Sequence, residues 1–236
     1  RIDLMSQLTY LLPHLLALSC SSPFWHGDDT GLKSYRLTIF DNLPRTGLPA
    51  EFQSYAEYQR HIQILINAGV MEDSTKIWWD LRPSARYPTL ETRIMDVCTR
   101  MDDAISLAAL LVSTIRMLYR LRIKNQRWRE YNPMLIRENR WRAMRYSFDE
   151  GLIDFGIGSI VPFKQLLDEL IELTFEDAKS LGCESEVAAT KDILSRGTSA
   201  HRQLKTYQLS MDAGQNHKDA LKDVVDMLII ETAADL

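Results

Sequence analysis

Cysteine is scarce in this sequence, and its spacing excludes two common classes of site. The 236 residues hold three cysteines, Cys20, Cys98 and Cys183, with no Cys-x-x-Cys among them, and five histidines with no pair at metal-ligand spacing. A zinc site and a disulfide framework are therefore both disfavoured. Sparse, odd-numbered thiols are typical of a reducing compartment, so we expect a cytoplasmic protein.

The sequence also lacks a hydrophobic run long enough to cross a membrane. Residues 4–27 contain no charged side chain, and the apolar stretch 8–18 has the character of a signal peptide. Asp3 beside Arg1 removes the positive flank that such a peptide needs, and Pro13 interrupts the middle. Because a bilayer span needs about 20 predominantly apolar residues, we expect a buried helix here, and residues 104–115 are too short as well.

No charge of one sign dominates, and the familiar catalytic motifs are missing. The formal charge is -4, from 28 Lys plus Arg against 32 Asp plus Glu, which gives no overall attraction to nucleic acid or anionic lipid. Phosphate-binding Gly-rich loops, a Gly-x-Ser-x-Gly nucleophile turn and a metalloprotease His-Glu pair are all absent from the sequence.

Charge is nevertheless unevenly placed along the chain. Residues 116–146 carry 10 Lys or Arg against 2 Asp or Glu, a local charge of +8, with Trp128 and Trp141 among the arginines. Such a segment can bind nucleic acid through phosphate contacts and stacking, form a solvated helical face, or hold a small phosphate-bearing ligand. No nucleic-acid motif accompanies it, so we expect no nucleic-acid partner, while the other two readings stay open.

What the sequence does contain is typical of a folded, helix-rich domain. Hydrophobic residues make up 45% and charged residues 25% of the chain, close to the average for soluble domains. Helical periodicity predicts a first helix of about four turns from Leu4 to Leu18, and an ordered loop region from Ser22 to Pro49 with a β-prone piece at Tyr35–Phe40. Further helices are predicted at 54–67, 101–123, 132–146, 160–181, 185–195, 199–210 and 216–233.

Residues 77–97 break the helical pattern and predict an antiparallel β-hairpin. Side chains alternate in polarity over Ile77–Arg82 and again over Leu90–Ile94, and the link between them is short and rich in proline. Alternate residues share a face of a strand, so four charges are expected on one side of the hairpin: Asp80, Arg82, Glu91 and Arg93. They suit either a metal-bound phosphate site or a solvated cross-strand ladder of ion pairs.

Several segments, taken in order, resemble one enzyme family. They are Leu16-Ala17-Leu18-Ser19-Cys20-Ser21-Ser22-Pro23-Phe24-Trp25, Ser34-Tyr35-Arg36, Leu43-Pro44-Arg45-Thr46-Gly47-Leu48-Pro49, Trp78-Trp79-Asp80-Leu81-Arg82-Pro83-Ser84, Thr89-Leu90-Glu91-Thr92-Arg93-Ile94-Met95-Asp96 and Glu138-Asn139-Arg140-Trp141-Arg142-Ala143-Met144-Arg145-Tyr146. Together they resemble the carboxylate-amine ligases, the type 2 glutamate-cysteine ligases. The resemblance implies an α+β fold, in which the hairpin belongs to a glutamine-synthetase-like catalytic sheet.

The resemblance also implies an activity and the molecules that take part in it. Such enzymes use ATP and Mg²⁺ to phosphorylate the side-chain carboxylate of glutamate, and an amine, cysteine in the best-known case, then displaces the phosphate. Preorganised cations stabilise the charge that gathers on the transferring group. ATP, glutamate and an amine such as cysteine are thus the expected partners, with a second copy of the chain, as a homo-oligomer, a further candidate.

Site residues follow from the same resemblance. Glu91 matches a metal ligand, Arg93 and Arg82 match catalytic positions, and Arg36 and Arg45 are expected to bind substrate. Phosphate or nucleotide binding is expected of Asn139, Arg142 and Arg145, which lie at i, i+3 and i+6 of one predicted helix, and of Arg202 after a Gly-rich turn at Gly197.

One departure from the family pattern bears on the activity of this chain. The acidic metal ligands and the His-x-His-x-Gly strand that relatives carry before the matching segment do not occur in it. We therefore expect residues 1–236 to be a single domain, the C-terminal portion of a ligase catalytic domain, and to be inactive alone. The alternative is a non-catalytic helical interaction module that keeps the family fold.

Overall fold

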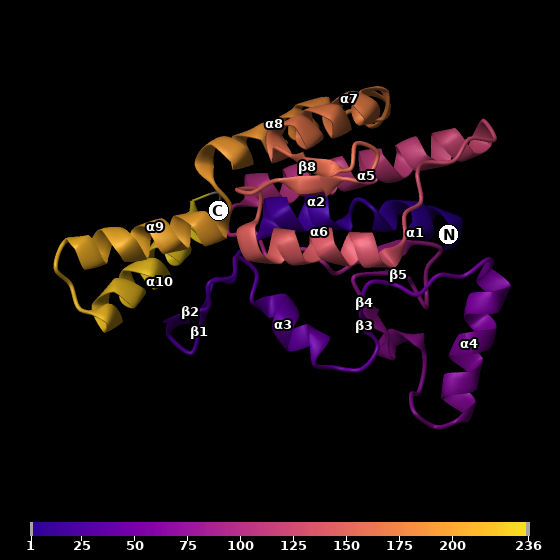
Figure 1. Cartoon of the computed structure of the whole chain (residues 1–236), viewed down its shortest axis with the longest axis horizontal. Coiled ribbons are helices and arrows are strands. Elements are labelled where there is room, and N and C mark those ends of the chain that lie inside the picture. Colours follow the sequence, from indigo (N-terminus) through magenta and orange to yellow (C-terminus); the bar gives the residue numbers. More distant parts are fainter. Residues whose placement is uncertain (1, 235–236) are drawn as a thin grey trace.

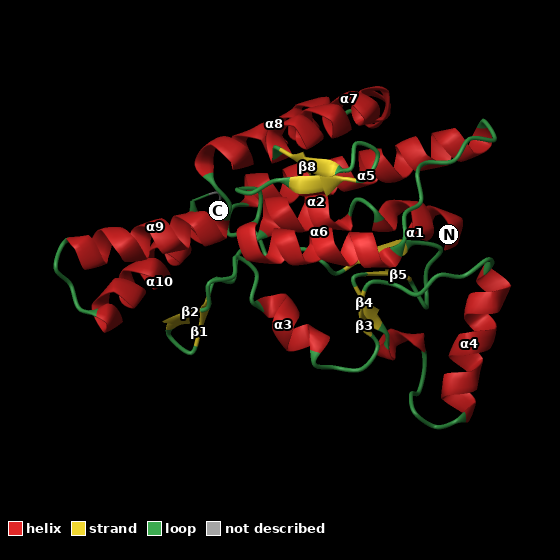
Figure 2. Cartoon of the chain, viewed as in Figure 1, coloured by secondary structure: helices red, strands yellow, loops and turns green. Residues whose placement is uncertain are grey.

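The computed structural model describes residues 2–234 and confirms a helix-rich α+β chain with small β-hairpins (Figures 1 and 2). The helices are α1 (Ile2–Thr9), α2 (Leu12–Ser19), α3 (Arg36–Asp41), α4 (Tyr55–Asn67), α5 (Met101–Ile123), α6 (Pro133–Tyr146), α7 (Phe163–Leu181), α8 (Glu184–Arg196), α9 (Ser199–Asp212) and α10 (His217–Ala233). The strands are β1 (Phe24–Trp25), β2 (Asp28–Asp29), β3 (Thr46–Gly47), β4 (Trp78–Trp79), β5 (Leu81–Pro83), β6 (Leu90–Thr92), β7 (Leu152–Asp154) and β8 (Ser159–Val161).

The core is built around α2, which lies between α5 and α6. Every residue of α2 is buried, as expected for a leucine-rich helix without charged side chains. The α5 helix packs against α1, α2, α7 and α8. The expectation that this region is too short to cross a membrane is wrong by length and composition, because α5 as a whole, alone among the described residues, meets that test. Its contacts are those of a core helix.

The first predicted helix is wrong as a single element, because the structure divides it into α1 and α2. The break falls at Tyr10–Leu11, and Pro13 lies in the first turn of α2. Proline has no backbone N–H to donate and its ring clashes with the preceding turn, so it is accepted at the start of a helix but not inside one.

Two further predictions of local structure are wrong. Tyr35–Phe40 is not extended, because α3 begins at Arg36. The Ser22 hydroxyl accepts a hydrogen bond from the Arg36 backbone N–H (3.0 Å), a contact between distant residues that local propensity does not contain. The helix predicted from residue 160 begins at Phe163, since Ser159–Val161 forms β8 and pairs with β7.

The predicted hairpin is confirmed over residues 81–92, whereas the single strand predicted over residues 77–82 is divided into β4 and β5. Its strands β5 and β6 are antiparallel, and Arg82 lies directly opposite Glu91. The sequence did not indicate that β4, just before β5, pairs in parallel with β3. Each ladder in residues 2–234 joins two strands, so the larger glutamine-synthetase-like sheet stays a prediction.

A buried histidine beside the core makes stability depend on pH. His14 of α2 is 4% exposed, its Nδ1 has no hydrogen-bond partner among the described residues, and the rings of Tyr10 and Phe163 lie against it. Burial lowers the pKa of His14 from 6.5 to about 4. The unfolded chain therefore binds a proton below pH 6.5 that the folded chain binds only near pH 4.

We predict that this difference removes on the order of 2 kcal/mol of unfolding free energy between pH 7 and pH 5. The variant His14→Leu has no titrating group there, so urea unfolding at the two pH values should show a correspondingly smaller loss. The control His61→Gln, at an exposed position of α4, should keep the wild-type pH dependence. An equal loss in His14→Leu and wild type would contradict the prediction.

Candidate functional site

The hairpin brings together three of the sequence-predicted site residues. Arg82 Nε and Nη2 lie 3.0 and 2.8 Å from Glu91 Oε2, and Arg93 Nη2 lies 2.5 Å from Glu91 Oε1. Arg82 is buried and also donates from Nη1 to the Thr75 carbonyl (2.8 Å), which fixes the turn before β4. The Glu91 side chain keeps 39% of its surface exposed. This is a cross-strand ladder of ion pairs, with its carboxylate accessible from solvent.

Asp80 lies on the inner side of the same segment. It is 3% exposed and forms part of the lining of a cavity of about 150 Å³, together with Arg36, Leu37, Phe40, Trp78 and Arg93. Burial raises the pKa of the Asp80 carboxyl, and the Arg140 guanidinium beside it opposes the rise. The expected face of four charges is thus present in part: Asp80 and Arg93 share this cavity, while Arg82 and Glu91 do not line it.

Arg36 reaches the cavity from the start of α3. Its Nε donates to Asp96 Oδ1 (2.7 Å), and its Nη2 donates to the backbone carbonyls of Arg93 (3.0 Å), Ile94 (2.7 Å) and Met95 (2.9 Å). Arg36 is therefore held tightly at the end of the hairpin. Its Nη1 has no hydrogen-bond partner among the described residues, which leaves one donor group available to a ligand.

Asp96 holds the loop before α3 against the hairpin, a role that sequence reasoning missed. Besides Arg36, it accepts hydrogen bonds from the Ser21 backbone N–H (2.9 Å) and from the hydroxyls of Ser22 (2.8 Å) and Ser34 (2.9 Å). These residues come from three of the segments that carried the resemblance. The signal was that these serines and Asp96 occur together in the matching segments, since the hydroxyl of a buried serine such as Ser34 needs an acceptor.

Arg45 lies on the other side of Trp78. Its Nε donates to the Lys76 carbonyl (3.1 Å), and it lines an open groove of about 440 Å³ with Lys76, Trp78 and residues 69–72. Trp78 lines both this groove and the smaller cavity. Arg45 is therefore near the hairpin but does not share a cavity with Arg36.

The three polar residues predicted on α6 contact different segments. Asn139 is 1% exposed and exchanges two hydrogen bonds of 2.8 Å with the backbone of Ile153 in β7. Arg142 donates to the carbonyls of Glu150 (2.6 Å) and Gly151 (3.2 Å). Arg145 donates to the carbonyl of Gly31. In the structure these side chains tether β7, the turn before it and the loop at Gly31 to α6.

Arg140, rather than its predicted neighbours, is the α6 residue that reaches the hairpin. Its guanidinium contacts the carboxylates of Asp80 and Asp41, and only 8% of the residue is exposed. A signal was present in the sequence. Arg140 lies at spacings of four, three and four from Ile136, Ala143 and Met144, all of which are buried, so it belongs to the apolar face of the helix.

Arg202 is placed in a network between helices. Its Nη2 lies 2.9 Å from Glu231 Oε2 of α10 and 3.1 Å from the Thr99 hydroxyl, and its Nη1 donates to the Gly197 carbonyl (2.5 Å). Burial raises the pKa of the Glu231 carboxyl, but the Arg202 and Thr99 hydrogen bonds outweigh it and hold that pKa below its usual value. These contacts join α9 to α10.

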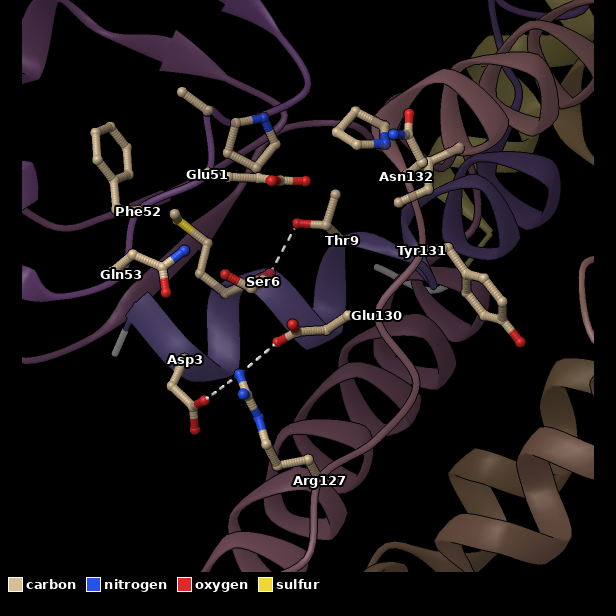
Figure 3. Close-up of a pocket in the computed structure, with 15 residues that line it drawn as sticks. Asp3, Ser6, Thr9, Glu51, Phe52, Gln53, Arg127, Glu130, Tyr131 and Asn132 are labelled. Carbon is tan, nitrogen blue, oxygen red and sulfur yellow. Dashed lines mark hydrogen bonds and ion pairs between the residues drawn. The ribbon is translucent and has the colours of Figure 1, made fainter.

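A larger cavity of about 490 Å³ lies beside α1, between residues 49–53 and 127–133 (Figure 3). Arg127 bridges Asp3 and Glu130 there, with N–O distances of 3.0 and 2.7 Å. Glu51 adds a third carboxylate to the lining. One guanidinium among three carboxylates disfavours an anionic ligand, and none of the sequence-predicted site residues lines this cavity.

The residues present do not make a magnesium site by themselves. Mg²⁺ is usually held by one or two carboxylates together with water and phosphate oxygens. Within residues 2–234 no three His, Cys, Asp or Glu side chains are grouped to hold a metal. Glu91 offers a single carboxylate whose two oxygens already contact Arg82 and Arg93. Any metal bound there needs further ligands.

Comparison with known proteins identifies the relatives of this chain. The model of glutamate-cysteine ligase family 2 matches residues 1–227. Three proteins named "Putative glutamate–cysteine ligase 2" are similar to this chain over 236 residues. Those from Rhodospirillum rubrum, Jannaschia sp. and Ruegeria pomeroyi are 59%, 58% and 57% identical to this chain. The match covers all of this chain and 61%, 62% and 61% of those relatives, so the chain spans about three fifths of their length.

The paired hydrogen bonds of Asn139 predict a structural cost on substitution. Asn139→Ala leaves the Ile153 backbone N–H and carbonyl without their partner, so we expect the unfolding free energy to fall by about 1–3 kcal/mol. Urea unfolding monitored by circular dichroism measures this change. The control Asn67→Ala, at the exposed end of α4, should cost less than about 0.5 kcal/mol. Equal effects in the two variants would contradict the assignment.

Proposed function

The chain belongs to glutamate-cysteine ligase family 2, and on that premise we propose that it forms part of the catalytic site of an ATP-dependent carboxylate-amine ligase. The reaction joins the side-chain carboxylate of glutamate to an amine such as cysteine. The observation that supports it most is that Arg36 and Arg93 line one small cavity while Arg93 and Arg82 pair with Glu91, on segments that the family match covers.

The chemistry explains why this arrangement is suitable. The γ-phosphoryl group of ATP passes to a carboxylate oxygen of glutamate and ADP leaves. The amine nitrogen then attacks the acyl carbon of the acyl phosphate, forms the amide bond and expels inorganic phosphate. Both steps concentrate negative charge on phosphoryl oxygens, and fixed arginines stabilise such charge without reorganising.

The arginines of the candidate site have different proposed roles in this reaction. Arg93 lines the cavity, and its Nε is buried without a hydrogen-bond partner in the described part of the chain, so it is suited to contact the transferred group directly. Arg82 is buried against Glu91 and the preceding turn, and holds the hairpin geometry. Arg36 and Arg45 are the proposed contacts for substrate carboxylate or phosphate on either side of Trp78.

Nucleotide and metal binding are further parts of the proposal. Arg142, Arg145, Arg202 and Asn139 are proposed to act on the phosphate side, where their present bonds to carbonyls and carboxylates position the surrounding loops. Glu91 is proposed as one ligand of Mg²⁺, which supplies charge neutralisation when bound. The remaining ligands, and the rest of the glutamine-synthetase-like sheet, would come from outside residues 2–234.

The proposal predicts a selective effect of Glu91→Gln. The substitution keeps the shape of the side chain and removes its charge, so turnover of the whole protein should fall at least a hundredfold and its dependence on Mg²⁺ concentration should change. Because Glu91 is more than a third exposed, the loss of fold stability should stay within about 1 kcal/mol. ADP release at varied Mg²⁺ measures the effect.

The matched control is Glu172→Gln at an exposed position of α7, which should behave as wild type. An unchanged Mg²⁺ dependence in Glu91→Gln would remove Glu91 from the metal site.

A second prediction concerns the 236 residues expressed alone. One carboxylate fixes neither the position nor the geometry of a metal-bound phosphate, so this chain should release no ADP above background with ATP, Mg²⁺, glutamate and cysteine. The control is the same assay on a protein of the relatives' full length. ADP release by the isolated chain, lost on Glu91→Gln, would contradict the prediction.

A further inference from the structure

Asp80 is a negatively charged residue in the wall of a cavity that two arginines also line. It is the one carboxylate among the six residues that line the cavity, and two of the others are Arg36 and Arg93. The counter-ions of those arginines, Asp96 and Glu91, lie outside the lining. A buried carboxylate is costly without a partner, and its charge repels any phosphate in the cavity. Something must therefore compensate Asp80.

Arg140 supplies that compensation from α6. Its Nε lies 2.7 Å from Asp80 Oδ2, and its Nη2 lies 3.4 Å from Oδ1. The remaining donors reach Asp41 at the end of α3, with Nη1 2.8 Å from Oδ2 and Nη2 2.9 Å from Oδ1. The guanidinium is thus shared between two carboxylates, and it is almost fully withdrawn from solvent.

The backbone of Asp80 links this pair to the cavity arginines. The Asp80 N–H donates to the Gly47 carbonyl (2.7 Å), and its carbonyl accepts from the Arg93 N–H (2.7 Å). Asp80 is therefore the residue at which the strand segment changes partner from β3 to β6. Since Arg36 Nη2 donates to the Arg93 carbonyl, a shift of Asp80 displaces both cavity arginines.

We propose that Arg140 is a positioning residue, which holds Asp80 in place and cancels its charge so that Arg36 and Arg93 keep the cavity cationic for a phosphate group. The inference deepens the proposed function, on which it rests for the identity of the substrate. A volume of about 150 Å³ suits a single phosphate group. Whole-ligand pockets are larger, about 300–1,000 Å³.

A merely structural ion pair predicts a different response to substitution. If Arg140 and Asp80 only hold elements together, removing either charge loosens the site and weakens ligand binding. If the Asp80 charge repels the anion and Arg140 neutralises that charge, removing the Asp80 charge strengthens ligand binding instead. Asn at position 80 can still accept the hydrogen bond from Arg140, so the geometry is preserved.

The experiment measures the affinity of the whole protein for inorganic phosphate by titration calorimetry. Asp80→Asn should bind phosphate severalfold more tightly than wild type, and Arg140→Gln at least tenfold more weakly. The double variant Asp80→Asn with Arg140→Gln should return to within about threefold of wild type, because it removes both charges. The control is Arg137→Gln, on the exposed side of the same helix, which should bind as wild type.

Weaker binding by Asp80→Asn, or a double variant no better than Arg140→Gln, overturns the proposal. If Arg140→Gln does not fold, Asp80→Asn and the double variant still decide it. Wild-type protein that shows no phosphate binding also overturns it. If the variants change phosphate affinity in the expected directions but the protein forms no amide, the inference is supported and the proposed function is rejected.

Discussion

The buried ion pair between Arg140 and Asp80 is the interaction on which the candidate site depends. It joins helix α6 to the strand segment 77–83, and Asp41 extends it to α3. Withdrawing a guanidinium and a carboxylate from water costs several kcal/mol per ion, which is recovered only with good geometry and full hydrogen bonding. Sharing one guanidinium between two carboxylates meets that condition, because every nitrogen of Arg140 has an acceptor.

Each of the arginines Arg36, Arg82, Arg93 and Arg140 is paired with at least one carboxylate. Arg36 pairs with Asp96, Arg82 and Arg93 pair with Glu91, and Arg140 pairs with Asp80 and Asp41. Four positive charges therefore meet four negative ones over these pairs, while the cavity lining itself holds two arginines against one carboxylate. A phosphate group would compete with Glu91 for Arg93, the one pairing of the cavity arginines that is substantially open to solvent.

How much of the fold could be predicted from the sequence depended on how far apart along the chain the interacting residues lie. That Arg82 and Glu91 share one face of the hairpin followed from the alternation of side chains along each strand, which is a local property. Their direct pairing across the ladder was not predicted and comes from the structure. The bounds of α5 followed from periodicity with acidic residues at its start and arginines at its end. The parallel pairing of β3 with β4 joins residues about thirty positions apart through two-residue strands, and no periodicity survives over two residues.

The sequence predicted the hairpin of the candidate site better than it predicted the contacts of helix α6. The resemblance indicated phosphate binding by α6, and the +8 charge of residues 116–146 left a solvated helical face and a phosphate site both open. The structure divides that charge among several partners. Arg116 and Arg120 pair with Asp177, and Arg122 and Arg127 pair with Asp3. Intramolecular pairing with an acidic remainder thus accounts for much of the excess.

What distinguishes Arg140 from these neighbours is desolvation. The pairs of Arg122 and Arg127 with Asp3 lie at the surface and are screened, so each contributes little to stability. Arg116 and Arg120 instead share the buried carboxylate of Asp177 while keeping a third or more of their own side chains exposed. Arg140 lies on the apolar face of α6, where a charge is tolerated only if a counter-ion is already in place. A count of charges along the sequence weighs all of them equally. The burial pattern of the helix separates the one arginine that must face a carboxylate from those that only cover the surface.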